Sequence, residues 1–242
     1  MSRQLTYQVR EDPPVTVVRF AGTLDRSTMT TAQRALDRCL AAQPDALVVD
    51  LARLAVRDRS ALSVFGAAAR QAADWPAVPM VLCAPPPEAA SWLAADARCP
   101  VVPVRRDYAE ATREVRDVAT PRLRVRLQPV ADACRRAREL TQDACGRWNV
   151  PQLVGPTSLV LSELVGNVVR HAGTPMQVTL TLRRPYLHVA VADGSRAAAR
   201  PASPGPDVPG GRGLLLVREL TQRWGTAPAG DGKVVWALLP AV

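Results

Sequence analysis

Residues 162–172 read SELVGNVVRHA, and within them Glu163 and Asn167 stand four positions apart among apolar residues. On an α-helix this spacing places both polar side chains on one face. A carboxylate beside an amide oxygen provides hard oxygen ligands that suit Mg²⁺, an ion that keeps several waters and bridges to phosphates. Taken alone, such a segment is more often an ordinary helix with two polar residues on its solvated face.

Two further segments follow in the chain. Residues 191–195 read VADGS, so Asp193 and Gly194 come directly after an apolar strand, where the carboxylate could accept a hydrogen bond from an exocyclic amine. Residues 210–217 read GGRGLLLV, and glycines directly before a helix let backbone N–H groups point at an anion. Alone, the first is typical of an Asp-Gly turn and the second of a flexible linker. The fixed order of all three segments is far more specific.

In this order, with a hairpin between the first two segments and a loose loop before the third, the chain resembles the ATPase fold shared by histidine kinases, gyrase and Hsp90. The resemblance is sharpest to the anti-sigma-factor serine kinases. It covers residues 118–242 and implies an α/β sandwich. The matching stretches are SELVGNVVRHA at 162–172, GRGL at 211–214, RWG at 223–225 and GKVVW at 232–236.

The resemblance implies a role for each matching residue. Glu163 would act as general base toward a serine hydroxyl or would position it, and Asn167 would hold Mg²⁺ on the phosphates of ATP. The adenine would be bound by Asp193 and Gly194, the phosphates by Gly211, Arg212 and Gly213, and a lid would span residues 196–210. An isolated kinase of this branch is commonly a homodimer.

One position departs from the family pattern. The family often has GKTVW where residues 232–236 read GKVVW, so Val234 replaces a threonine whose hydroxyl lies close to the adenine. We therefore expect a weaker nucleotide contact at Val234. His171 is a helix-end residue in this family, and packing or capping is its expected role.

In the first half, strand signals at 15–20, 46–51, 79–83 and 101–104 alternate with helix signals at 27–42, 60–73, 88–95 and 108–115. This alternation predicts a sheet with helical cover. The stretches VVRFAGTLD at 17–25, LVVDL at 47–51 and VRDRSAL at 56–62 resemble the STAS domain of anti-sigma-factor antagonists, which implies a mixed sheet with helices. Residues 58–61 read DRSA where antagonists that are switched by phosphorylation carry DSSG. Ser60 is thus either a candidate phosphoacceptor or only a helix cap.

The second half has a different pattern of elements. We expect strands at 123–127, 176–182, 186–192 and 234–239, and helices at 130–148, 157–172 and 213–224. A composition break near Pro121 predicts two domains, residues 1–117 and 118–242. The fold class is therefore α/β in both halves.

Composition and charge argue against several classes of protein. With 48% hydrophobic and 22% charged residues, the chain is globular and not a disordered tail. Because there is no apolar run of membrane-spanning length and no signal peptide, we expect a cytoplasmic protein without membrane contact. Residues 118–242 carry 16 basic and 8 acidic residues, a net charge of +8. No DNA-reading motif accompanies this charge, so we expect no direct nucleic-acid contact.

Cysteine and lysine usage is also informative. Five cysteines, an odd number without C-x-x-C spacing, favour reduced and packed thiols over disulfides or a zinc site. Lys233 is the only lysine among 31 basic residues. With abundant alanine and proline, this bias indicates a GC-rich genome before it indicates function.

Two functions from different classes remain. In the first, the chain is a partner-switching regulator that uses ATP and Mg²⁺ to sequester a sigma factor or to phosphorylate a STAS antagonist, with the fused STAS-like domain as cis substrate or as inhibitor. In the second, it is a catalytically weak protein-interaction module. A sensor histidine kinase is disfavoured, because the only histidines are His171 in the Glu/Asn helix and His188 in an expected strand.

Overall fold

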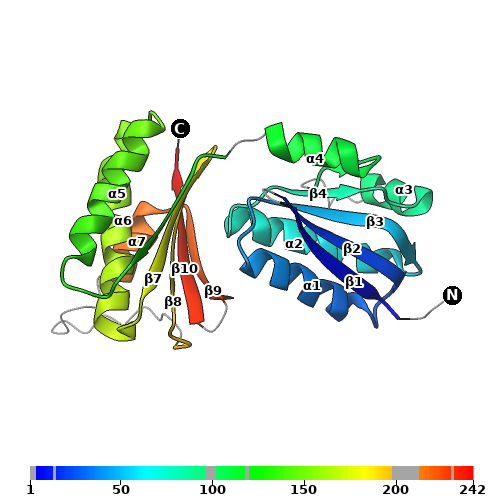
Figure 1. The fold of residues 1–242 in the computed structure, drawn as a ribbon, viewed down its shortest axis with the longest axis horizontal. Coiled ribbons are helices and arrows are strands. Elements are labelled where there is room, and N and C mark those ends of the chain that lie inside the picture. The colour runs from blue at the N-terminus through cyan, green and yellow to red at the C-terminus, as the bar shows by residue number, and fades with distance from the viewer. Residues whose placement is uncertain are drawn as a thin grey trace. The chain divides into compact units, whose positions relative to one another are not determined.

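The chain forms two compact units. A computed structural model describes residues 4–12, 15–95, 102–117, 120–197, 213–229 and 232–241. The first unit comprises Met1–Ala119, and the second comprises Thr120–Val242. Each unit contains one five-stranded sheet with helices packed against it (Figure 1). The predicted α/β fold class is confirmed.

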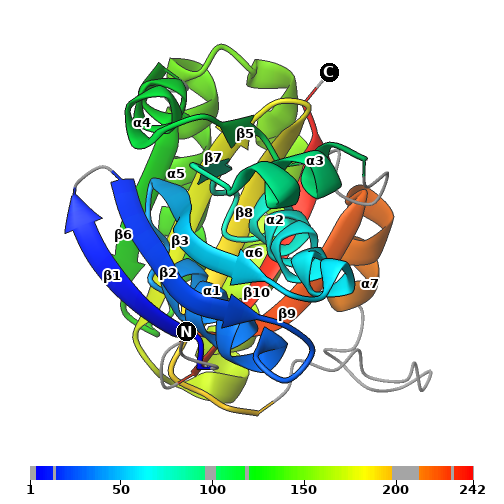
Figure 2. The ribbon, with the colours of Figure 1, turned by 90° about the vertical axis from the view of Figure 1, so that its right-hand side faces the viewer.

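The first unit has a mixed sheet with strand order β1-β2-β3-β4-β5. Strand β1 runs antiparallel to β2, and the remaining neighbours are parallel (Figure 2). The strands are β1 (Thr6–Asp12), β2 (Val15–Leu24), β3 (Ala46–Val56), β4 (Met80–Cys83) and β5 (Val104–Arg105). The helices are α1 (Met29–Ala41), α2 (Ser63–Asp74), α3 (Pro87–Ala95) and α4 (Tyr108–Asp117), with a 3-10 turn over Arg59–Leu62 before α2.

Alternating side chains of the central strands feed two cores in the first unit. Leu47 and Val49 of β3 belong to the core that contains α1 and α2, where the rings of Phe20 and Phe65 meet at 6.0 Å between centroids. Val48, between them in sequence, belongs to the core on the other face, together with residues of α4. The period of two explains why residues 46–49 are apolar throughout, because both faces of the strand are covered.

The second unit has an antiparallel sheet with strand order β6-β7-β8-β10-β9. The strands are β6 (Arg122–Leu127), β7 (Met176–Arg183), β8 (Tyr186–Asp193), β9 (Arg223–Ala229) and β10 (Gly232–Pro240). Its helices are α5 (Ala133–Arg147), α6 (Val154–Asn167) and α7 (Gly213–Leu220), with a 3-10 turn over Pro151–Leu153 before α6 and a π-helical turn over Val168–Ala172 directly after it. All three helices lie on one face of the sheet (Figure 1).

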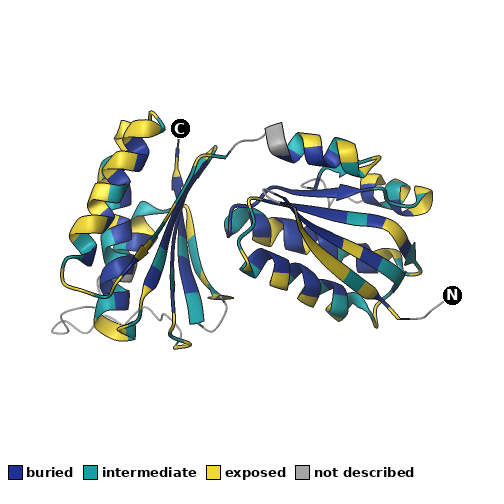
Figure 3. Cartoon of the chain, viewed as in Figure 1, coloured by how far each residue is buried: buried dark blue, intermediate teal, exposed yellow. Residues whose placement is uncertain are grey.

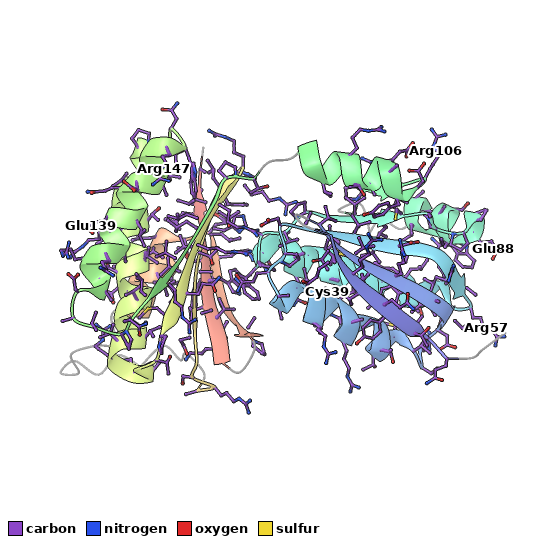
Figure 4. The ribbon with its side chains drawn as sticks, viewed as in Figure 1. Cys39, Arg57, Glu88, Arg106, Glu139 and Arg147 are labelled. Carbon is purple, nitrogen blue, oxygen red and sulfur yellow. The ribbon has the colours of Figure 1, made fainter. Side chains whose placement is uncertain are left out.

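The core of the second unit fills the space between this sheet and its helices. Its buried residues alternate along the strands and include Leu161, Leu164, Val165, Val178, Leu180, Val189, Val191, Val235 and Ala237. Figure 3 shows buried residues along the strands and exposed residues on the outer side of α5. That outer side carries surface ion pairs, such as Arg147 with Asp143 at 2.8 Å, and Figure 4 labels Arg147 and Glu139 there.

The thiols that the structure describes are unpaired. Cys39, Cys83, Cys134 and Cys145 are free, in agreement with the expectation of reduced cysteines. Burial raises the pKa of the Cys39 thiol to about 11 and that of Cys83 to about 12. Because only the thiolate is a strong nucleophile, these two buried side chains are inert packing residues.

Two elements differ from the sequence-based expectation. The helix predicted over residues 213–224 ends at Leu220, and Arg223–Ala229 instead forms strand β9, paired antiparallel with β10. In this pairing Gly225 lies opposite Trp236, and a Cβ on Gly225 would come within 2.6 Å of the indole. Strand β1, which was not predicted, is an edge strand that exists through its pairing with β2. Both errors concern edge strands, whose formation depends on a partner strand more than on local periodicity.

Among the described residues, no helix has the length and apolar character needed to cross a membrane.

Candidate functional site

Helix α6 presents Glu163 and Asn167 on one side and its apolar residues on the other. Leu161, Leu164 and Val165 are buried against the sheet, whereas Glu163 and Asn167 are half-buried. After Asn167 the helix continues as the π-helical turn, which closes with a hydrogen bond of 2.8 Å from the Gly173 N–H to the Val168 carbonyl. Such wide turns are frequent at functional sites, because they redirect the side chains within them.

The π-helical turn places Arg170 across the predicted Mg²⁺ ligands. Its Nη2 donates to Asn167 Oδ1 at 3.1 Å and lies 3.7 Å from Glu163 Oε2. The guanidinium also lies over Gly166, where a Cβ would come within 3.0 Å of Nη1. The oxygens of Glu163 and Asn167 therefore converge on one positive charge, which is the property required of a cation site. Sequence reasoning did not single out Arg170, although its spacing of three from Asn167 was a usable signal.

Asp193 ends strand β8 with an almost completely buried carboxylate. Its side chain is 2% exposed, and its Oδ1 accepts hydrogen bonds from the Ser195 N–H at 2.7 Å and from Lys233 Nζ at 3.0 Å. Lys233 stands directly opposite Asp193 on β10. Within the described part of the chain no hydrogen bond reaches Oδ2. One oxygen is thus fixed by the protein, and the second remains available as an acceptor.

The Asp193–Gly194 turn is tied to the end of the α6 segment. The Gly194 N–H donates to Thr174 Oγ1 at 3.0 Å, and Thr174 follows directly after Gly173, which ends the π-helical turn in the left-handed region at φ 62°. A Cβ on Gly194 would stand 3.4 Å from the Thr174 side chain, so a larger residue fits there only tightly. The first two predicted segments are therefore joined in space, through a threonine that sequence reasoning missed.

The third predicted segment is described in part. Gly213 is the first residue of α7, and α7 packs against α6. Gly211 and Arg212, which the resemblance assigns to the phosphates, lie outside the described residues, as do residues 198–210 of the predicted lid. The start of α7 thus belongs to the same side of the sheet as Glu163 and Asn167.

The register of β10 against β8 decides on which face of the sheet Val234 lies. Val234 pairs with Ala192 of β8, and the neighbouring pair in the same register is Lys233 with Asp193. Because neighbouring side chains of a strand point to opposite faces, the Val234 side chain lies on the face away from the Asp193 carboxylate. A hydroxyl at this position would not reach that carboxylate, and the weaker nucleotide contact expected at Val234 stays a prediction.

In the first unit, Ser60 is an exposed residue held by Asp58. The Asp58 Oδ1 accepts from the Ser60 N–H at 2.8 Å and from Ser60 Oγ at 2.7 Å, while Arg26 Nε lies 3.0 Å from Oδ2. The hydroxyl and N–H of Ser60, with a smaller contribution from Arg26, hold the pKa of the Asp58 carboxyl below its usual value. The N-cap of the turn Arg59–Leu62 is therefore Asp58 and not Ser60.

Among the described residues, no group of three or more His, Cys, Asp or Glu side chains could hold a metal ion. A Mg²⁺ ion that is bound chiefly through phosphates and waters needs only one or two protein ligands. The Glu163–Asn167 pair and the free Oδ2 of Asp193 therefore fit Mg²⁺ and an adenine nucleotide.

Two family models match the chain. The family described as the histidine kinase-like ATPase domain matches residues 109–238, and the STAS domain family matches residues 6–111. The first match begins within α4, ahead of the second compact unit. No curated protein matches the chain.

Solved structures match parts of the chain at low sequence identity. An anti-sigma factor antagonist from Mycobacterium paratuberculosis is 21% identical with a TM-score of 0.44, and the match covers 48% of this chain and 98% of that one. The RsbU and RsbW domains of Rv1364c from Mycobacterium tuberculosis are 17% identical with a TM-score of 0.39, covering 50% of this chain and 32% of that one. The Bacillus cell fate determinant SpoIIAA in its phosphorylated form is 17% identical with a TM-score of 0.37, covering 46% and 99%.

The two family matches together span most of the sequence, and the residues of the ATPase match include Glu163, Asn167 and Asp193. The chain therefore belongs to the histidine kinase-like ATPase domain family, with a STAS domain preceding the ATPase domain.

Proposed function

We propose that the protein is a partner-switching regulator: an ATP-binding anti-sigma factor with serine kinase activity toward a STAS antagonist. The observation that carries this proposal is the convergence of Glu163 and Asn167 on one cation, Arg170, in a domain whose Asp193 keeps a free carboxylate oxygen. The fusion of an ATPase domain to a STAS domain supports the same function, because kinase and antagonist are the two halves of such a switch.

ATP would supply the phosphoryl group, and Mg²⁺ would neutralise charge on its phosphates. Asp193 Oδ2 would accept a hydrogen bond from the adenine amine, since Oδ1 is already held by Ser195 and Lys233. Asn167 Oδ1 would contribute the amide oxygen that holds the cation. For this to occur, the Arg170 guanidinium has to move from its present contact at 3.1 Å.

Glu163 would serve as the base. Its carboxylate would accept the proton of the acceptor serine as the bond from Oγ to the γ-phosphorus forms and the bond from that phosphorus to the leaving ADP breaks. In the present structure this carboxylate lies 3.7 Å from Arg170 Nη2, a distance longer than a hydrogen bond. The contact is therefore weak enough to exchange for a substrate hydroxyl.

Ser60 is the acceptor that the chain itself offers. It is exposed and lies in the turn Arg59–Leu62, and its hydroxyl donates to Asp58 at 2.7 Å. Incubation of the full chain with ATP and Mg²⁺, beside Ser60→Ala, distinguishes the two roles of the STAS domain. Phosphate on Ser60 supports a cis substrate. Phosphate only on a separate STAS antagonist supports a docked, inhibitory copy.

The proposal predicts that Asn167→Ala weakens nucleotide binding. In calorimetry on the full chain, a non-hydrolysable ATP analogue with Mg²⁺ should bind in the micromolar range, and Asn167→Ala should bind about 10- to 100-fold more weakly because an oxygen ligand is lost. Asn167→Asp, which keeps an oxygen there, should bind more tightly than Asn167→Ala. Gln142→Ala, an amide truncated on the exposed side of α5, serves as control.

If the wild type does not bind the ATP analogue, the protein does not act through nucleotide binding. The ATPase fold would then be a docking scaffold, and the catalytically weak interaction module would become the leading candidate. The departure of residues 58–61 from DSSG to DRSA favours that second candidate. In either case a sigma factor or a STAS antagonist should be retained by the full chain in a pull-down, and failure to retain either at any nucleotide state would contradict partner switching.

A further inference from the structure

Lys233 is the only lysine of a chain with 31 basic residues, and it pairs with the carboxylate that the proposed function assigns to adenine. Its Nζ lies 3.0 Å from Asp193 Oδ1 and 3.3 Å from the Ser195 carbonyl. The two side chains are 15% and 2% exposed, so this ion pair is largely removed from solvent. Ion pairs such as Arg19 with Asp50 and Arg105 with Glu114 are more exposed than this one.

The local geometry requires a compact cation. Lys233 and Asp193 face each other across adjacent strands, and the ammonium finds two acceptors, one carboxylate oxygen and one carbonyl. An arginine would bring five donors in a rigid planar fork, which these two acceptors would not satisfy. This accounts for the lysine at position 233, although all the other residues counted as basic in this chain are arginines.

The pair has a chemical consequence for an incoming base. Lys233 and the Ser195 N–H hold Oδ1, and Oδ2 has no donor within the described residues. A carboxylate oxygen is a hydrogen-bond acceptor. Adenine presents an amine donor at its exocyclic position, whereas guanine presents the acceptor O6 there. In the pose that turns this exocyclic group toward Oδ2, the carboxylate therefore accepts a hydrogen bond from the adenine amine and repels O6 of guanine.

We propose that Lys233 is a positioning residue that sets the selectivity of this site for ATP over GTP. It acts through Asp193, by fixing Oδ1 and thereby the position of the acceptor Oδ2. This inference rests on the proposed function, because it requires that the site bind a purine nucleotide. It extends that function by naming the residue that determines which purine is bound.

The test is calorimetry on the full chain with non-hydrolysable ATP and GTP analogues, each with Mg²⁺. The wild type should prefer the ATP analogue, and Lys233→Met, which keeps the length of the side chain without its charge, should lower the ATP-to-GTP affinity ratio about tenfold or more. Lys233→Arg should recover part of that ratio. Arg147→Met, which removes an exposed ion pair on α5, should leave it unchanged. Circular dichroism verifies that each variant is folded.

The outcomes are distinct. If Lys233→Met weakens both analogues equally and leaves their ratio unchanged, Lys233 only joins two strands and the inference is wrong, while nucleotide binding stands. If the wild type binds neither analogue, the proposed function fails and the inference with it. Should Lys233→Met not fold, Asp193→Asn provides the same test, because its amide offers guanine a donor and should also lower the ratio. An unchanged ratio in a folded Asp193→Asn would overturn the inference.

Discussion

Replacing Gly232 by alanine should abolish nucleotide binding and destabilise the second unit by about 3 kcal/mol. A Cβ at this position would lie 1.8 Å from the Asp193 carbonyl oxygen and 2.8 Å from Gly194 Cα. These neighbours are backbone atoms, so no side-chain rotation relieves the clash. The start of β10 would have to separate from the end of β8, and Lys233 would move away from Asp193.

The measurements are urea unfolding followed by tryptophan fluorescence, and calorimetry with an ATP analogue. A matched control is Gly146→Ala in α5, where nothing lies within 4 Å of the added Cβ. Because alanine is the better helix former by about 1 kcal/mol, Gly146→Ala should be neutral or stabilising and should bind nucleotide normally. If Gly232→Ala proves as stable as the wild type and binds the analogue, the close approach of β10 to Asp193 is wrong.

Glu163→Gln should leave nucleotide binding nearly intact and slow phosphoryl transfer about 10²- to 10⁴-fold. Glutamine has the shape of glutamate and can still accept a hydrogen bond from a serine hydroxyl, but it cannot take the proton. The reaction is followed as phosphate incorporated into a STAS antagonist or into Ser60, under single-turnover conditions, so that binding and transfer are separated.

Glu139→Gln is the matched control, since Glu139 is an exposed glutamate on the outer side of the neighbouring helix α5 (Figure 4). It should not change either quantity. Equal transfer rates for Glu163→Gln and the wild type would show that Glu163 orients the acceptor without removing its proton. A rate of zero in both would favour the interaction module.

Much of the site could be predicted from the sequence, because each of its segments is a short local stretch of chain. The spacing of Glu163 and Asn167 places them on one helical face whatever packs around that helix, and α6 has this arrangement. An Asp-Gly pair after an apolar strand also stands where it was expected, at the end of β8. In the first half, the alternation of apolar strands and amphipathic helices predicted a sheet with helical cover. Its mixed character was implied only by the STAS resemblance, because the antiparallel strand β1 was not predicted from the residues.

Other features depended on contacts between distant segments. Residues 223–229 form a strand because β10 offers them a partner, although the apolar pattern of residues 213–224 alone favoured a continued helix. The place of Val234 required the register of β10 against β8, since a shift by one residue would turn its side chain to the other face. The helix cap at Asp58 was likewise visible only once its carboxylate met the Ser60 N–H.

By itself, then, the sequence determined which residue types stand at each end of a helix or strand, because periodicity and turn chemistry are properties of neighbouring residues. Only the tertiary structure decided which of these ends meet. Arg170 reaches the Glu163–Asn167 pair because a π-helical turn redirects it, and Lys233 reaches Asp193 from 40 residues away because two strands pair in one register. The pair of Lys233 with Asp193 arises from chain topology, and no local pattern of residues encodes it.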